Sequence, residues 1–122
     1  MDNVTDIEQA IQTHTQWMSQ LRQAVLDALS GIDVQTVRAD SHCEFGKWLR
    51  GPGLSANDRL TDHYLEVRRL HAEFHDLAGK IVELAAAGRV AEAYTLLYGE
   101  YITLSGRLIL AMRAWQASLL GF

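Results

Sequence analysis

The sequence predicts an all-α fold. We expect a four-helix bundle of three long helices and one short helix that carries the cysteine motif, in a single domain over residues 1–122. The 122 residues contain only one proline, and the nine glycines stand mostly between long periodic runs. Within those runs apolar residues recur every three or four positions, which is the period of an amphipathic helix. With 48% hydrophobic residues, the chain is long enough to bury one core.

The first long helix is expected from Asn3 to Leu29. Its apolar seam alternates steps of three and four without a break, over Val4, Ile7, Ile11, His14, Met18, Leu21, Val25 and Ala28. His14 therefore stands at a position where an apolar residue is expected. Gly31 follows at a natural C-terminal cap position.

The short helix is expected to begin around Ser41. Serine followed three residues later by Glu44 is a capping box, which puts Cys43 in the first helical turn. The unpaired N–H groups and the dipole at a helix start favour thiolate over thiol. The sequence Gly51-Pro52-Gly53 then ends the helix.

Two more long helices follow, one from about Ser55 to Gly88 and one from about Val90. The seam of the third helix is Leu60, Tyr64, Val67, His71, Phe74, Ala78, Ile81 and Ala85. The seam of the last helix is Tyr94, Leu97, Tyr101, Leu104, Leu108, Ala111 and Trp115. His71 is the polar residue on the third seam, and His75 lies one turn further on the same face.

Composition excludes several classes of function. Eleven basic and fifteen acidic residues give a net charge of −4, so we expect no nucleic-acid partner. No apolar run reaches the ~18 residues of a membrane span, so we expect no membrane contact. The single cysteine forbids an intrachain disulfide and indicates a reducing compartment, for which the cytoplasm is the best assignment.

These residues predict a metal site of one thiolate and three imidazoles: His14, Cys43, His71 and His75. This ligand set is typical of a closed tetrahedral zinc site, so the expected cofactor is a zinc ion. Taken singly, a core histidine is more often bonded to a carbonyl or carboxylate, and a lone cysteine is often a small buried hydrophobe. The coincidence of histidines on two seams favours the metal site.

The remaining histidines are left out of the predicted site. His42 adjoins Cys43, and adjacent helical residues point about 100° apart, which makes joint ligation awkward. His63 lies off the seam and is the reserve ligand should His14 not take part.

We expect no catalytic residues and no enzyme. The chain lacks the His-Glu-x-x-His pattern, any Glu-x-x-His pair and a glycine-rich phosphate loop. Four protein ligands would also leave no position on zinc for a reactive water. A weaker rival is a hydrolase with three histidines on an open zinc site, which requires Cys43 to lie outside the coordination sphere.

The pattern His14-x-x-Trp17, Cys43-x-Phe45-Gly46-x-Trp48-Leu49 and His71-x-x-Phe74-His75 resembles the chemoreceptor zinc-binding domain of bacteria. The resemblance implies the same four ligands, with Trp17 as a wall of the site and Phe45 and Trp48 clamping the short helix. It also implies a homodimer and an output module in cis or trans, such as a methyl-accepting signalling region or a diguanylate cyclase. Hypochlorous acid is implied as a possible stimulus.

Our first hypothesis is therefore a cytoplasmic zinc-binding sensory or regulatory domain. Zinc occupancy or oxidation of Cys43 would modulate a bacterial signalling output. The alternative is a structural helical dimerisation domain in which zinc is only a staple.

Overall fold

The structure is a computed structural model that describes residues 3–26 and 44–121. Its elements are α1 (Asn3–Leu26), α3 (Glu44–Arg50), the 3-10 helix η2 (Asp58–Leu60), α4 (Asp62–Ala86), α5 (Val90–Leu96), the π-helical segment η3 (Leu97–Tyr101) and α6 (Ile102–Leu119). The described residues contain no strand, so the all-α prediction is confirmed. None of their helices is long and apolar enough to cross a membrane.

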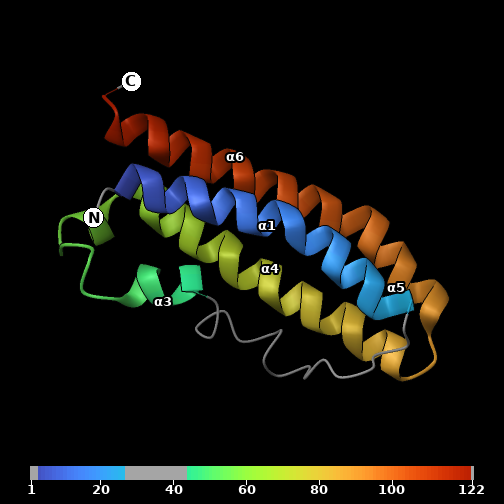
Figure 1. Cartoon of the computed structure of the whole chain (residues 1–122). Helices are drawn as coiled ribbons and strands as arrows, with labels where there is room; N and C mark the ends of the chain where they lie inside the picture. The colour runs from blue at the N-terminus through green and yellow to red at the C-terminus, as the bar shows by residue number, and fades with distance from the viewer. Residues whose placement is uncertain (1–2, 27–43, 122) are drawn as a thin grey trace.

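Three long helical segments lie side by side (Figure 1). Helices α1 and α4 run in the same direction, and the continuous segment α5–η3–α6 runs back between the same two ends. The short helix α3 lies against the first turns of α4, where the Tyr64 hydroxyl donates a hydrogen bond of 2.9 Å to the Leu49 carbonyl. Both ends of the described chain lie at one end of the bundle.

The predicted seams form the core. On α1 the buried seam residues are Ile7, Ile11, His14, Leu21 and Val25; on α4 they are Tyr64, Val67, His71, Phe74, Ala78, Ile81 and Ala85. The 3.6-residue period places these side chains on one face, and burial of that face supplies most of the stability of such helices.

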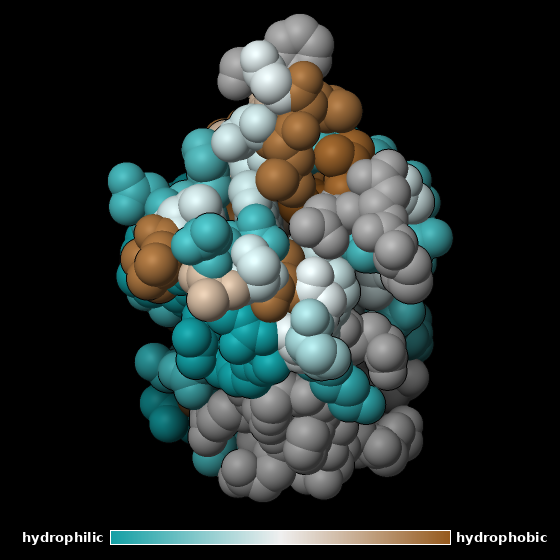
Figure 2. Space-filling model, turned by 90° about the vertical axis from the view of Figure 1, so that its left-hand side faces the viewer, coloured by the Kyte–Doolittle hydropathy of each residue, from teal (hydrophilic) through white to brown (hydrophobic). Residues whose placement is uncertain are grey.

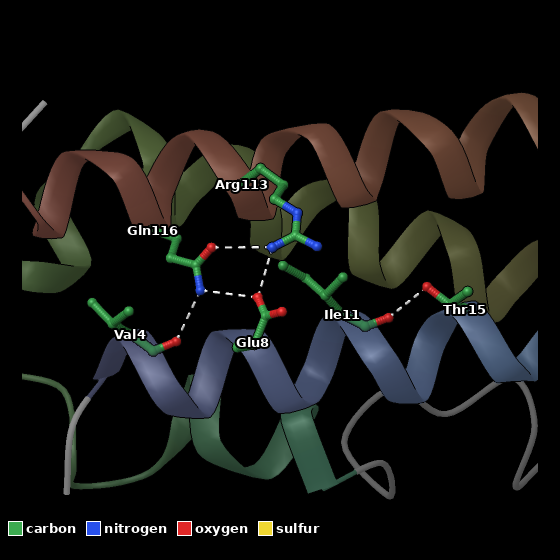
Figure 3. Close-up of polar contacts among 6 residues, drawn as sticks. All are labelled: Val4, Glu8, Ile11, Thr15, Arg113 and Gln116. Atoms are coloured by element: carbon green, nitrogen blue, oxygen red, sulfur yellow. Dashed lines mark hydrogen bonds and ion pairs between the residues drawn. The ribbon is translucent and has the colours of Figure 1, made fainter.

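A polar network ties α1 to α6 on the surface (Figure 3). Arg113 Nη1 donates to Glu8 Oε2 at 2.6 Å, and Gln116 Nε2 donates to the same oxygen at 3.1 Å. Gln116 Nε2 also donates to the Val4 carbonyl at 3.1 Å. These bonds fix the axial register of α1 against α6, and Glu8 lies less than two turns from His14.

The third long helix begins later than predicted. Ser55 and Asp58 exchange hydrogen bonds, with Ser55 N donating to Asp58 Oδ2 at 2.9 Å and Asp58 N to Ser55 Oγ at 3.1 Å. This capping box opens only the 3-10 turn, because Thr61 is extended (φ −74°, ψ 147°) and caps a new helix. The prediction of a helix from Ser55 is thus wrong, and so is the predicted burial of Leu60, which is 76% exposed.

The last helix contains a π-helical turn that the period did not predict. Its buried positions start at Ala93, Leu97 and Tyr101, two successive steps of four. In a regular α-helix such steps drift around the axis, whereas a wider π turn keeps the three side chains on the core face. Of the predicted seam, Leu97, Tyr101, Leu108 and Trp115 are buried, with Tyr94, Leu104 and Ala111 half-buried.

The observed ends of α3 and α4 agree with the predicted helix ends. Helix α3 ends at Arg50, directly before Gly51. Gly88 adopts φ +80° after α4, where a residue without a side chain is unstrained. The predicted end of the first helix at residues 27–29 lies outside the described residues, as do Ser41 of the capping box and Cys43.

Candidate metal centre

Two neighbouring helices bring three histidines together. His14 comes from the middle of α1, and His71 and His75 occupy successive turns of α4. Their ligand nitrogens all lie within 4.8 Å of one another. The three side chains are 1%, 0% and 2% exposed, so the cluster lies inside the bundle.

The hydrogen bonding of His14 orients its ring toward the cluster. Nδ1 of His14 is 2.7 Å from the Ala10 carbonyl oxygen. A carbonyl only accepts, so Nδ1 carries the proton and Nε2 of the neutral ring carries a lone pair. That Nε2 lies 3.1 Å from Nε2 of His71. A backbone carbonyl behind the distal nitrogen is also the usual support of a metal-binding histidine.

The arrangement fits a tetrahedral zinc ion. Zn–N bonds of roughly 2.0–2.1 Å at a tetrahedral angle separate two ligand nitrogens by about 3.3 Å. The His14–His71 pair is already near that separation, and the widest pair has to close by up to about 1.5 Å.

The cluster is electrostatically prepared to bind a cation. Burial lowers the pKa of His14 to about 4, helped by the nearby His75, while the Ala10 carbonyl opposes the shift. Burial lowers the pKa of His71 to about 2, helped by His75, His14 and Arg50. Near neutral pH both imidazoles are therefore uncharged, which is the form that ligates a metal.

Aromatic side chains enclose the histidines. The ring of Phe45 on α3 lies edge-on at 5.7 Å from His14 and 5.2 Å from His71. Phe74 approaches His14 at 5.3 Å, and Trp17 approaches His75 at 6.0 Å. The predicted role of Trp17 as a wall of the site is thus supported by contact. These rings keep the site dry, which strengthens electrostatic interactions within it.

The short helix is clamped onto the bundle beside this cluster. Phe45 stacks on Trp48 at 5.5 Å with 19° between the ring planes, and Trp48 lies 5.5 Å from Trp115 of α6. Tyr64 packs against Trp115 at 5.9 Å and holds Leu49 through its hydroxyl. The clamp expected of Phe45 and Trp48 is present.

Of the four predicted ligands, the structure brings His14, His71 and His75 together, and Cys43 lies outside the described residues. The reserve ligand His63 is half-buried and does not belong to the group. The sequence alone did not identify Tyr64 and Trp115 as the residues that anchor α3. Both lie on predicted seams, but a seam predicts only that a side chain is buried. It does not predict that the Tyr64 hydroxyl bonds to the Leu49 carbonyl, 15 residues away.

These features define a helical metal-binding domain with a buried histidine cluster. In a comparison with protein families, residues 14–82 match the chemoreceptor zinc-binding domain. The chain belongs to this family, whose members bind zinc, and its histidine group is positioned to hold a metal ion. Neither the curated proteins nor the solved structures gave a match.

Proposed function

We propose that this chain is a cytoplasmic zinc-binding regulatory domain that modulates a bacterial signalling output. The observation that carries the proposal is the cluster of three buried histidines from two helices. In this proposal, zinc is held by His14, His71, His75 and Cys43. The output module, of the chemoreceptor or diguanylate cyclase type, acts in cis or in trans, and the domain works as a homodimer.

The position of α3 supports the assignment of Cys43 as the fourth ligand. Cys43 directly precedes α3, and Phe45, two residues later, already contacts His14 and His71. Residues two apart in a chain are close together, so the side chain of Cys43 can reach the histidine cluster. A thiolate would add the negative charge that three neutral imidazoles lack, and a fourth protein ligand closes the tetrahedron.

A closed site implies regulation rather than catalysis. When bound, zinc supplies a cross-link between α1, α4 and the start of α3. Moving a two-state population from ~1:99 to ~99:1 requires about 5.5 kcal/mol of differential binding. Structural zinc sites release roughly 10 kcal/mol or more near neutral pH, so the free energy suffices for a switch.

Oxidation offers a second input to the same site. A thiolate reacts with oxidants such as hypochlorous acid, and the oxidised sulfur is a poor zinc ligand. Oxidation of Cys43 would therefore release zinc or weaken its binding. Zinc occupancy and oxidation then converge on one output.

The alternative is a structural dimerisation domain in which zinc is only a staple. The origin of the three histidines on two separate helices favours it, because a metal bound there would cross-link these helices. The two functions differ in what happens to the bundle when zinc is removed.

Zinc quantification and chelation test the proposal. Purified protein should contain one zinc per chain, and Cys43→Ala should retain far less at equal dialysis. After chelation, a switch keeps its helical circular dichroism but changes its packing or assembly, whereas a staple melts. Full zinc retention by Cys43→Ala would reject the ligand set, and melting on chelation would favour the staple.

A further inference from the structure

Two buried aromatic rings connect the histidine cluster to the last helix. The ring of Phe74 on α4 lies 5.3 Å from that of His14 and 5.5 Å from that of His75. It also packs against the ring of Tyr101, at 5.1 Å. Phe74 and Tyr101 are both 0% exposed. In a close-packed interior a displaced ring displaces its neighbours, so a movement of the histidines reaches Tyr101 through Phe74.

Tyr101 is the last residue of the π turn, which spans Leu97–Tyr101. This turn interrupts a segment that is α-helical on both sides, in α5 and in α6. A π turn differs from an α turn by one extra residue and by its hydrogen-bond pattern, and such turns are frequent at functional sites. The segment can change from one pattern to the other by exchanging hydrogen-bond partners within the helix. The π turn is thus an element with two discrete arrangements, as coupling between distant sites requires.

The hydroxyl of Tyr101 is poorly placed in the π arrangement. Among the described residues it finds no hydrogen-bond partner, although it is buried. Burial raises the pKa of Tyr101, so the hydroxyl keeps its proton and remains an unused donor. A buried donor without an acceptor is unfavourable. The π turn therefore holds the ring against Phe74 while it leaves the hydroxyl unsatisfied, and this favours a second arrangement.

The two helices beside the π turn are held differently. Helix α6 is anchored towards the end of the bundle that faces the viewer in Figure 2, where its last turn stands at the top. Arg113 bonds to Glu8 of α1, and Trp115 packs 5.5 Å from Trp48 of α3. Of the seven residues of α5, only Ala93 is buried. A change in the π turn therefore displaces α5 more easily than α6.

We propose that the π turn transmits the occupancy of the histidine cluster to α5. Ligation requires the widest pair of ligand nitrogens to draw together by up to about 1.5 Å. Phe74 follows the histidines, and Tyr101 loses the support that keeps the π turn. The turn then takes the α-helical pattern, and α5 is displaced against α4. This inference concerns the regulation of the proposed zinc site, and in that respect it rests on the proposed function.

The change reaches the molecular surface at a pair of tyrosines. Tyr94 of α5 and Tyr98 of the π turn stack with their ring centroids 5.9 Å apart and 12° between the planes. Tyr98 is 51% exposed. The pair spans the junction between α5 and the π turn, so a change of hydrogen-bond pattern there separates the two rings. The rings thus report the state of the turn, and fluorine NMR of protein labelled with 3-fluorotyrosine can follow them.

The first test removes the extra residue of the π turn. Gly99 lies in this turn and is exposed, so its deletion should convert the turn into regular α-helix. Because coupling is reciprocal, zinc binding by the full chain should tighten about threefold or more in competition with a chelating dye. Gly99→Ala is the matched control. It loses the same glycine but keeps the chain length, and its Cβ meets nothing within 4 Å, so zinc affinity should stay at the wild-type value.

The second test makes the opposite change. Tyr101→Phe removes the unsatisfied hydroxyl and so stabilises the π turn, which should weaken zinc binding about threefold or more. Tyr98→Phe, at an exposed ring of the same turn, is the control and should leave the affinity unchanged. Circular dichroism confirms that each variant is folded.

Fluorine NMR completes the experiment. The chain has four tyrosines, so the labelled protein gives four signals, which single Tyr→Phe variants assign. The signals of Tyr94 and Tyr98 should shift when zinc is added to the wild type and should not shift in the deletion variant. Wild-type zinc affinity in both the deletion variant and Tyr101→Phe would overturn the relay alone, as would signals of Tyr94 and Tyr98 that ignore zinc. A wild type that binds no zinc would overturn the proposed function together with the relay.

Discussion

His14 and His71 face each other across the contact between α1 and α4, with their Nε2 atoms 3.1 Å apart. Because Nδ1 of His14 carries the proton of that ring, Nε2 of His71 donates this hydrogen bond and Nε2 of His14 accepts it. A bound zinc ion would take the place of that proton, and both imidazoles would offer it a lone pair. The same contact thus serves the metal-free and the metal-bound protein, and substitutions in it should affect both forms.

Replacing His14 with leucine should weaken both metal binding and the stability of the bundle. The substitution removes a proposed ligand and should weaken zinc binding at least about 100-fold, since even supporting contacts contribute 10- to 100-fold. The metal-free variant should also be about 1–3 kcal/mol less stable than the metal-free wild type, because the buried Nε2 of His71 loses its hydrogen-bond partner. Competition with a chelating dye and urea unfolding measure the two effects.

The control for this experiment is His63→Leu. His63 lies outside the cluster and is half-buried, so its replacement should leave zinc affinity unchanged. Equal zinc affinity in His14→Leu and the wild type would exclude His14 as a ligand.

The metal-free protein should lose stability as the pH falls below about 6.5. The folded-state pKa values of His14 and His71, about 4 and about 2, lie below the ordinary value of 6.5. Between pH 6.5 and pH 4 the unfolded chain therefore binds more protons than the folded chain, and the free energy of unfolding decreases as the pH falls. The slope approaches roughly 1.4 kcal/mol per pH unit for each histidine.

Urea titrations of chelated protein at several pH values from 5 to 8 measure this dependence. The free energy of unfolding should be nearly level from pH 7.5 to pH 8 and fall steeply below pH 6.5. His14→Leu should reduce the slope by about half. A stability that stayed level down to pH 5 would show that the histidines become protonated without cost in the folded state.

The sequence was informative where structure depends on local period. The seams of α1 and α4 predicted burial of His14 and His71 because the helical repeat alone decides which side chains share a face. Spacing likewise placed His75 beside His71. That the seams of α1 and α4 pack against each other depends on tertiary structure. Only the occurrence of histidines on both seams, together with the cysteine, indicated it.

The sequence was less informative where two signals compete or where a contact is distant. The capping box at Ser55 opened only a 3-10 turn because Thr61 offers a second cap. The hydroxyl of Thr61 accepts a hydrogen bond of 3.2 Å from the Tyr64 N–H. The π turn ends at Tyr101, whose ring is buried against Phe74 of α4, a tertiary contact that no local pattern predicts. The Glu8–Arg113 contact joins residues 105 positions apart, for which no local pattern exists.

Tyr64→Phe should loosen α3 without disturbing the core. The substitution removes only the hydroxyl that donates to the Leu49 carbonyl at 2.9 Å, and a buried carbonyl left without its donor costs about 1–3 kcal/mol. Hydrogen exchange of the amides of α3 should accelerate more than that of α1. Tyr98→Phe, at an exposed tyrosine, is the matched control and should change neither the free energy of unfolding nor the hydrogen exchange of α3. An unchanged exchange rate in α3 would mean that the aromatic contacts of Trp48 alone hold this helix.

Breaking the Glu8–Arg113 contact should have a small, salt-dependent effect on stability and a measurable effect on metal binding. The side chains of Arg113 and Glu8 are 51% and 37% exposed, so Arg113→Gln should lower the free energy of unfolding only slightly, and less at high ionic strength. The contact fixes the register of α1 less than two turns from His14, so a looser register should weaken zinc binding several-fold. Arg69→Gln removes a comparable exposed cation that pairs only within α4, and should leave zinc affinity unchanged. Zinc titrations of the wild type and both variants at low and high salt measure the effect on metal binding. An equal zinc affinity in all three proteins would show that the Glu8–Arg113 contact is only a surface ion pair.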